Sequence, residues 1–205
     1  PKTFKLFNLN IARLRDELNL VTDNRVRHTT VITLPNAAGE LEEFEVVEAS
    51  NFVPELQARF PEIRAFSGRG KTDKAATIKL SISPQGVQTM VFRHGRENEF
   101  MEPYSQDHNV YAVYVSQRDK GSLPWTCSTQ DQQIFSGINA QIANTGRPLS
   151  NAGELKTMRL AQSCNGEYSN YFGAFNSTQV ALVLAAYNAT LTRCNGVYEE
   201  DLALH

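Results

Sequence analysis

Strand-like patterns fill the first half of the chain, between residues 29 and 116. Runs of β-branched residues, and runs in which apolar and polar residues alternate, are typical of strands. The predicted strands are Thr29 to Leu34, Glu42 to Glu48, Ile63 to Phe66, Thr77 to Ile82, Val87 to Phe92, Glu99 to Glu102 and Val110 to Val115. Turn residues between them predict an antiparallel meander. The last run is apolar on both faces, so we expect it to be a central strand.

Two short helices are predicted beside these strands. The first covers about Asn10 to Leu20 and carries Ile11, Leu14 and Leu18 on one face. The second covers about Val53 to Phe60 and has a proline in its first turn, where the missing N–H is not needed.

Two other stretches are predicted to be irregular. Ser67 to Lys71 contains Gly and Lys but lacks the spacing of a phosphate-binding loop, so we interpret it as an ordinary loop. From Gln117 to Leu155 the composition shifts to Gln, Ser, Asn, Thr and Gly and the strand pattern is lost. We interpret this stretch as a linker, with a short helix predicted within about Gln130 to Asn144.

The strongest helical pattern lies near the end of the chain, at about Thr178 to Cys194. Val180, Leu184, Tyr187 and Leu191 recur at three- and four-residue steps and form one predicted apolar face. The alanines in the same stretch favour close packing of the helix on a sheet.

The elements on either side of this helix are predicted from turn and strand signals. We expect a strand from Met158 to Ser163, a turn region from Asn165 to Asn176, and a helix end at Asn195-Gly196. A second strand is predicted to begin near Asp201. Because one strand and one helix cannot bury a core on both faces of the strand, we interpret this segment as the front of a domain.

Composition narrows the classes of function. The 205 residues carry a net charge of -2, and their basic residues form no concentrated face, which argues against a nucleic-acid partner. The longest apolar run, Val180 to Ala186, is too short to span a membrane. The sequence shows no signal peptide, but it begins at Pro1 rather than Met, which is compatible with a leader that has been removed.

The C-terminal segment also resembles a known family. The matching residues are Arg159 to Tyr168 (RLAQSCNGEY), the Ala-rich helix with Asn188-Ala189-Thr190, and Arg193 to Glu199 (RCNGVYE). They resemble the start of the catalytic domain of reprolysin-like (adamalysin-type, metzincin) zinc metallopeptidases, in the version found in secreted bacterial enzymes. Such enzymes are made with a folded N-terminal pro-region, which Phe60 to Arg64 and Ser67 to Gly70 resemble.

The resemblance implies an organisation in three parts within an α+β chain. These are a β-rich pro-domain (1–116), a linker (117–155), and the first strand and helix of a metzincin-like α/β catalytic domain (156–205). The implied function is that of a pro-region in a secreted zymogen, which keeps the protease latent and assists its folding. Its implied partner is the remainder of the catalytic domain.

The zinc site of that family is absent from this sequence. The family binds zinc with H-E-x-x-H-x-x-G-x-x-H, in which two histidines hold the metal and the glutamate activates water. The chain has four histidines, His28, His94, His108 and His205; none precedes Glu, and no two are four apart. We therefore expect the complete enzyme to use zinc, and this chain alone to bind none and to be inactive. His94 and His108 flank an acidic segment, which we interpret as a solvated hairpin rather than a metal site.

Three cysteines are present, so at least one is unpaired within the chain. Cys164 and Cys194 follow the predicted strand and helix, and a bridge between them would close a loop of about 30 residues and stabilise by roughly 3–4 kcal/mol. The alternative is two buried free thiols. Cys127 lies in the linker, where the family resemblance implies a thiolate that occupies the fourth zinc position and blocks the catalytic water. The alternative for Cys127 is an ordinary half-buried cysteine beside a core tryptophan.

A second hypothesis comes from a different class of protein: a stand-alone secreted β-rich binding or adhesion module with a helical tail. The two hypotheses differ in what covers the Val180–Leu191 face. The pro-region hypothesis predicts an exposed apolar helix face or sheet edge that needs a partner, whereas the binding module predicts a closed core.

Overall fold

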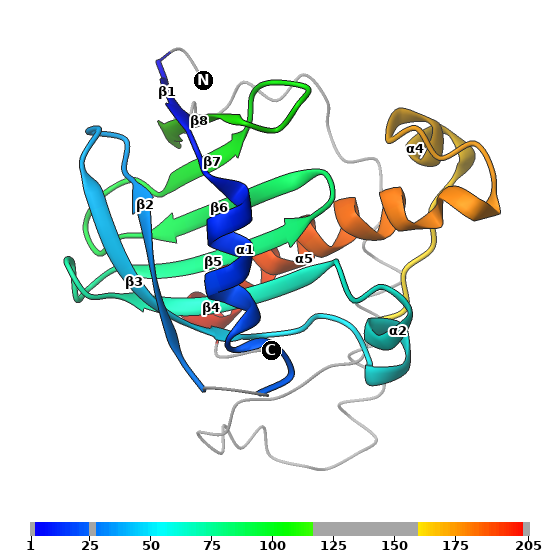
Figure 1. The fold of residues 1–205 in the computed structure, drawn as a ribbon, viewed down its shortest axis with the longest axis horizontal. Coiled ribbons are helices and arrows are strands. Elements are labelled where there is room, and N and C mark those ends of the chain that lie inside the picture. Colours follow the sequence, from blue (N-terminus) through cyan, green and yellow to red (C-terminus); the bar gives the residue numbers. More distant parts are fainter. Residues whose placement is uncertain (1–2, 25–27, 117–159, 203–205) are drawn as a thin grey trace, which may run out of the picture.

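A curled antiparallel sheet with helices on both of its faces forms the protein (Figure 1). The computed structural model describes residues 3–24, 28–116 and 160–202. The strands are β1 (Lys5–Asn8), β2 (Thr30–Pro35), β3 (Leu41–Glu48), β4 (Arg64–Gly70), β5 (Thr77–Ser83), β6 (Gly86–Phe92), β7 (Glu99–Pro103) and β8 (Val110–Val115). The helices are α1 (Ile11–Asn19), α2 (Pro54–Arg59), α4 (Gly166–Tyr171) and α5 (Val180–Leu202), with 3-10 turns η1 (Thr22–Asn24) and η2 (Ser177–Gln179). The α+β class expected from the sequence is thus confirmed.

The strand order is β1-β8-β7-β6-β5-β4-β3-β2. The strands from β2 to β8 form the predicted meander, each pairing antiparallel with the next. Strand β1 then pairs with β8 at the far edge. Consecutive strands β1 and β2 therefore lie at opposite edges, and α1 connects them across the concave face of the sheet (Figure 1).

The predicted strands of the meander are confirmed with small shifts in their ends, but two details differ. Strand β8 is the second strand from the edge rather than a central one, because β1, which was not predicted, pairs on its outer side. The stretch Ser67 to Gly70 belongs to β4 rather than to a loop. Gly68 allows this pairing, since a Cβ at that position would lie 2.4 Å from the carbonyl oxygen of Glu45 on β3.

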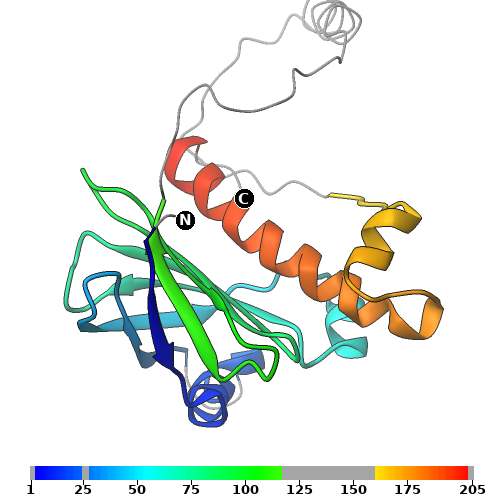
Figure 2. The same ribbon diagram turned by 90° about the horizontal axis from the view of Figure 1, so that it is seen from above.

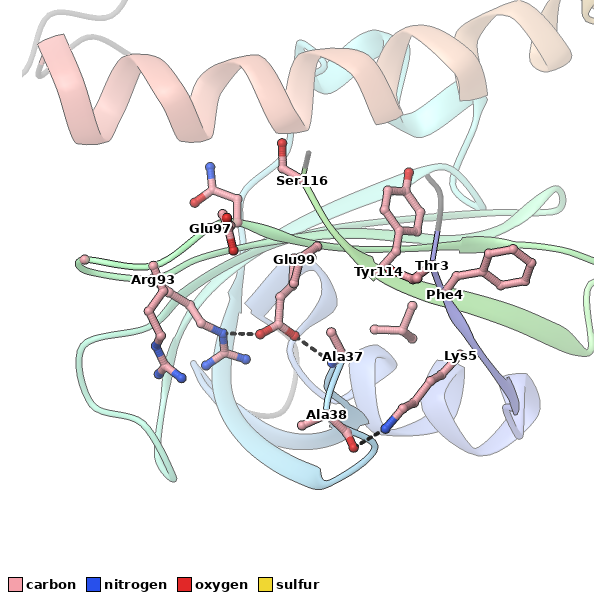
Figure 3. A pocket seen from close by; sticks show the side chains of 15 residues that line it. Thr3, Phe4, Lys5, Ala37, Ala38, Arg93, Glu97, Glu99, Tyr114 and Ser116 are labelled. Atoms are coloured by element: carbon pink, nitrogen blue, oxygen red, sulfur yellow. Dashed lines mark hydrogen bonds and ion pairs between the residues drawn. The ribbon is translucent and has the colours of Figure 1, made fainter. Parts of the chain in front are cut away.

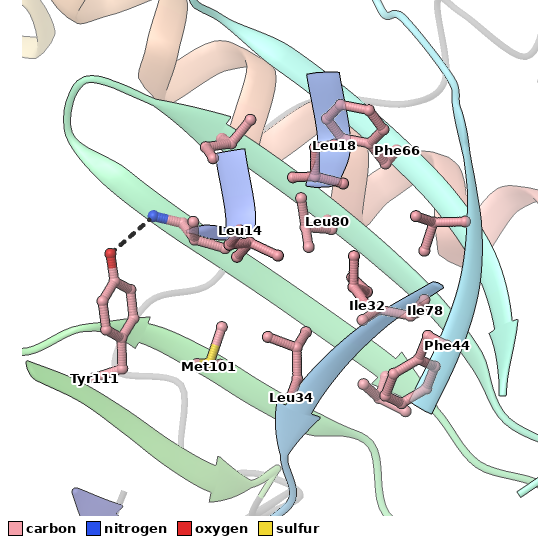
Figure 4. Close-up of a cluster of buried hydrophobic side chains, with 14 of the residues drawn as sticks. Leu14, Leu18, Ile32, Leu34, Phe44, Phe66, Ile78, Leu80, Met101 and Tyr111 are labelled. Atoms are coloured by element: carbon pink, nitrogen blue, oxygen red, sulfur yellow. Dashed lines mark hydrogen bonds between the residues drawn. The ribbon is translucent and has the colours of Figure 1, made fainter. Parts of the chain in front are cut away.

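The hydrophobic core fills the concave side of the sheet. Asn10 accepts a hydrogen bond from the Arg13 N–H and caps α1, which then buries Leu14 and Leu18 against the strands, as the helical pattern predicted. Figure 4 shows these leucines together with Ile78, Leu80 and their neighbours. Every member of this cluster lies between residues 7 and 113, so the helices α4 and α5 contribute nothing to it.

Helix α5 lies on the other face of the sheet, over β4, β5 and β6 (Figure 2). The packing predicted for Ala181, Ala185 and Ala186 is confirmed for Ala185 and Ala186, which are buried, whereas Ala181 is half-buried. Ala189 is buried as well. The predicted apolar face is wrong in its details: Val180 is 41% exposed, and the other three predicted members are only half-buried. Small and polar residues occupy the buried positions because the helix approaches the sheet closely.

The predicted ends of this segment are also wrong. Residues 160–163 are not a strand, and α4 forms within the predicted turn region. Helix α5 continues through Asn195-Gly196 to Leu202, so the second strand expected near Asp201 is helix. A glycine ends a helix by adopting a positive φ, as Gly173 does after α4 with a φ of 79°. Gly196 is not among the glycines with positive φ.

The linker from 117 to 155 and the first residues of the predicted strand at 158–163 lie outside the described residues. No helix within the described ranges is long and apolar enough to cross a membrane.

Candidate functional site

The candidate site is the contact between α5 and the sheet, which we call the helix–sheet interface. Side chains alternate between the two faces of a strand. In β5, Ile78, Leu80 and Ile82 are buried in the core, and Lys79, between them, points to the outer face, where α5 lies. The outer face of this central strand is thus polar, whereas its inner face is apolar.

A polar side chain stands at the centre of the buried face of α5. Asn188 is 2% exposed, and its Nδ2 donates to the carbonyl oxygen of Arg64 on β4 at 2.9 Å. Its Oδ1 accepts a hydrogen bond from Nδ2 of Asn51, also at 2.9 Å. Asn51 lies in the segment between β3 and α2, so the helix is held by two different parts of the sheet domain.

Asn51 contacts two further residues of α5. Its Nδ2 lies 2.8 Å from Oγ1 of Thr192, and its Oδ1 accepts from Nδ2 of Asn195 at 2.9 Å. The Thr192 hydroxyl donates back to the carbonyl oxygen of Asn188 at 2.6 Å. Three residues of one helix face, at successive turns, therefore meet one asparagine.

Two ion pairs lie nearer the end of α5. Nζ of Lys79, whose side chain is 4% exposed, lies 2.5 Å from a carboxylate oxygen of Glu199. Arg193 lies 2.8 Å from Glu102 on β7 and stacks over the Phe100 ring at 5.3 Å. Glu102 also accepts a hydrogen bond from the hydroxyl of Tyr114. Burial and the nearby Glu102 carboxylate raise the pKa of Tyr114 to about 12.

This arrangement fixes the position of the helix more than it stabilises the fold. Buried polar groups are costly when unpaired, and these groups meet partners only in one register and one orientation of α5. The helix–sheet interface therefore has the chemistry of a recognition surface for one particular helix.

A second polar cluster lies on the concave side, around Arg93. Its guanidinium is within 2.6 Å of Glu99, 2.6 Å of Glu42 and 3.1 Å of Asp73. Burial lowers the pKa of Arg93, but hydrogen bonds and charge interactions with Glu42 and Glu99 outweigh it and raise the pKa above its ordinary value. The N–H of Ala75, together with Arg93, holds the pKa of Asp73 below its usual value.

Arg93 and Glu99 form part of the wall of an open groove of about 1080 Å³ (Figure 3). The groove is lined by residues of β1, the β2–β3 turn, the β6–β7 turn and β8. Arg93, Glu99 and Lys5 are engaged with protein atoms: Glu99 also accepts from the Ala37 N–H at 2.8 Å, and Lys5 donates to the Ala38 carbonyl. We therefore interpret the cluster around Arg93 as a structural tie between strands.

The cysteines singled out in the sequence do not come together in a site. Cys127 lies outside the described residues. Cys164 and Cys194 are free thiols, so the predicted bridge is not present in the structure. Cys164 is exposed and contacts Ser169 at 3.2 Å in a hollow beside Tyr168 and Tyr187. The hydrogen bonds to Ser169 and Tyr187 lower the pKa of the Cys164 thiol.

The histidines do not gather either. His94 and His108 lie in the β6–β7 and β7–β8 turns, which are at opposite ends of an antiparallel meander. In the part of the chain that the structure describes, no group of three or more His, Cys, Asp or Glu side chains can hold a metal ion.

Sequence reasoning missed Asn51, Lys79 and Glu199 as members of the helix–sheet interface. Asn188 was noted only within the Asn188-Ala189-Thr190 match to the family. The sequence feature that indicates this interface is an asparagine among the alanines of a helix. If such a position is buried, the asparagine side chain requires a polar partner.

In comparisons with known proteins, no protein-family model, curated protein or solved structure matches this chain.

Proposed function

We propose that residues 1–116 are the pro-region of a secreted zinc metallopeptidase and that α5 is the first helix of its catalytic domain. In this proposal the pro-region keeps the peptidase latent and assists the folding of the domain that follows it. The remainder of the catalytic domain is the partner and supplies the zinc site. This chain alone hydrolyses no peptide bond.

One observation supports this proposal most strongly. The hydrophobic cluster on the concave side of the sheet is drawn entirely from residues before 114, whereas α5, which carries the family-like residues, is bound to the opposite face of the sheet. A pro-region must fold without the enzyme and still hold part of it. A sheet with its own core and a recognition surface for one catalytic-domain helix meets both requirements.

Exposed apolar side chains near α4 add support. Leu160, Tyr171, Phe175 and Val180 are all exposed, with Tyr171 at 84%. Apolar side chains gathered on one part of a surface commonly mark a protein contact. In the proposed precursor, the rest of the catalytic domain covers them.

The stand-alone binding module is the second candidate, and one observation favours it. The sheet of the same chain covers the central part of α5, where Ala185, Asn188 and Ala189 are buried. That hypothesis predicted a closed core at the Val180–Leu191 face, whereas the covered face is a neighbouring one, since Val180 is exposed and Leu191 is half-buried. The two candidates therefore have to be separated by activity.

The test uses the precursor purified from the full-length gene. The proposal predicts bound zinc, no peptidase activity, and a gain of activity when Cys127→Ser removes the candidate inhibitory thiol. Cys164→Ser is the matched control and should leave the precursor latent, because Cys164 is exposed and lies beside Ser169 and Tyr187.

One result would reject the proposal, and another would reject only the role of Cys127. A full-length product without zinc would exclude a metallopeptidase and leave the binding module. A zinc-containing precursor that stays equally inactive in the Cys127→Ser and wild-type forms would remove Cys127 from the latency mechanism.

A further inference from the structure

The sheet domain has two faces of different chemistry. Its concave face buries the apolar cluster that includes Leu14, Leu80 and Tyr111. On the outer face, Lys79 of the central strand β5 is a charged residue, and Ser81 and Ser83 alternate with the core residues on the same strand. The neighbouring strands add apolar side chains to the same face: Phe92 lies under Gly196, Phe100 lies under Arg193, and Met90, which pairs with Lys79 in the register, is buried. Because the apolar cluster of the concave face contains no residue of α5, removal of α5 would leave that cluster intact.

The face of α5 that meets the sheet has a matching composition. Its buried positions are mostly small or polar, with Val183 as the larger apolar side chain, and the helix rests on Phe92 through Gly196. The small and polar ones are Ala185, Ala186, Asn188, Ala189 and Thr192. Small and polar side chains bury little apolar area, which is characteristic of interfaces between parts of a chain that separate. The hydrogen bonds of Asn188 and Thr192 have water as an alternative partner when the helix leaves.

We propose that the outer face of the sheet is a helix-docking surface from which α5 detaches as a unit while the sheet domain stays folded. Asn51, the carbonyl of Arg64 and Lys79 recognise the helix, and Asn188, Thr192, Asn195 and Glu199 are the residues recognised. The partner is an α-helix with a narrow Ala-rich face and polar residues at positions i, i+4, i+7 and i+11. The inference deepens the proposed function, because a pro-region that releases its enzyme needs such a surface.

Native-state hydrogen exchange of the intact chain tests this inference. Amides of β5 should exchange only through global unfolding, whereas amides of α5 should exchange through a separate opening that is at least about tenfold more frequent. Thr192→Ala should raise the exchange rates of α5 amides about tenfold, since it removes a buried hydrogen-bonding hydroxyl, and leave the β5 rates unchanged.

Thr190→Ala is the matched control on the same helix. Thr190 is exposed, and its hydroxyl donates to the Ala186 carbonyl one turn earlier rather than to the sheet. It should change the α5 exchange rates by less than about twofold. Asn51→Ala, which alters the surface from the side of the sheet, should reproduce the effect of Thr192→Ala.

Three outcomes would overturn the inference. Equal exchange rates in α5 and β5 would show that both unfold together. If Thr192→Ala raised the exchange rates of α5 and β5 amides equally, α5 would be part of the core structure. A Thr192→Ala variant that fails to fold would show the same. Equal effects of Thr192→Ala and Thr190→Ala would remove the recognition role. These results do not depend on peptidase activity, so the docking surface and the zymogen proposal can fail separately.

Discussion

At the scale of single residues, Arg93 is the most constrained charge in the described chain. Its side chain is 2% exposed and meets Glu42, Asp73 and Glu99, which come from β3, the β4–β5 connection and β7. A buried ion pair adds little net stability, but removing one partner is costly because the other charges remain buried and unpaired.

Replacing this residue should therefore destabilise the sheet domain strongly. Arg93→Met keeps the length of the side chain but leaves Glu42 and Glu99 without their cation and Asp73 with only the exposed Arg96. We expect it to lower the free energy of unfolding by about 3–5 kcal/mol. Urea denaturation followed by circular dichroism measures the change.

Arg96→Met is the control for this prediction. Arg96 also pairs with Asp73, but its side chain is 65% exposed. The expected loss is about 0–1 kcal/mol, as for other surface ion pairs. Similar losses in the two variants would show that the cluster around Arg93 is as well solvated as a surface pair.

The sequence could not reveal this residue. Arg93 begins Arg93-His94-Gly95-Arg96, which has the composition of an exposed turn. The partners Glu42 and Asp73 lie 51 and 20 positions away, so only the register of the sheet brings them together.

At the scale of elements, α5 shows how packing overrides a local signal. Asn-Gly was interpreted as a helix end because glycine is common there. In the structure Gly196 is helical, and a Cβ on it would lie 2.5 Å from the Phe92 ring and 2.9 Å from Cγ of Lys79. The glycine is required for close approach to the sheet rather than for a turn.

Gly196→Ala should therefore weaken the docking of α5 although alanine favours helix. The gain in helix propensity is about 1 kcal/mol, and the cost of forcing a methyl group against the Phe92 ring is about 1–3 kcal/mol. We expect the α5 amides to exchange faster, and hydrogen exchange measures this directly.

Gly166→Ala serves as the comparison. Gly166 begins α4, and a Cβ there meets nothing within 4 Å. In the Gly166→Ala variant, the α5 amides should exchange at the wild-type rate or more slowly. Slower exchange of α5 in Gly196→Ala would contradict the prediction and show that Phe92 moves aside without cost.

The sequence predicted helices and strands correctly where the alternation of apolar and polar residues extends over a whole element. It predicted them poorly where contacts with distant parts of the chain determine the structure. The hairpin of β2 and β3 and the amphipathic α1 were predicted because each buries one face on a regular period. Strand β1 was missed because it is four residues long and Leu6 is 48% exposed, so its pairing with β8 leaves no alternation to detect. The helix–sheet interface was missed because its members come from segments far apart in the sequence, such as Asn51, Lys79 and Asn188.

At the scale of the whole molecule, residues 1–116 have the properties of an independent folding unit. The buried cluster, both sheet edges and α1 all lie within them. A polypeptide that ends at Ser116 should therefore fold alone, since it keeps the whole apolar cluster of the concave face and loses only the contacts of the outer face with α5.

Urea denaturation of the 1–116 polypeptide checks this prediction. Far-ultraviolet circular dichroism follows the secondary structure, and the near-ultraviolet circular dichroism of the tyrosines follows the tertiary packing. A single cooperative transition with sheet-like ellipticity is the expected result. A noncooperative transition, or a polypeptide that aggregates in the absence of denaturant, would show that α5 is needed to complete the fold.

The strand order has a consequence for synthesis on the ribosome. Lys5 pairs with Val113, so β1 must wait until roughly a hundred further residues have been translated, which takes about 5–20 s at typical elongation rates. During that interval the hairpins from β2 onward can already pair with their neighbours, while the beginning of the chain has no partner strand. The N-terminal strand is thus the last to be added to the sheet, and a nascent chain stalled before β8 exposes it to chaperones.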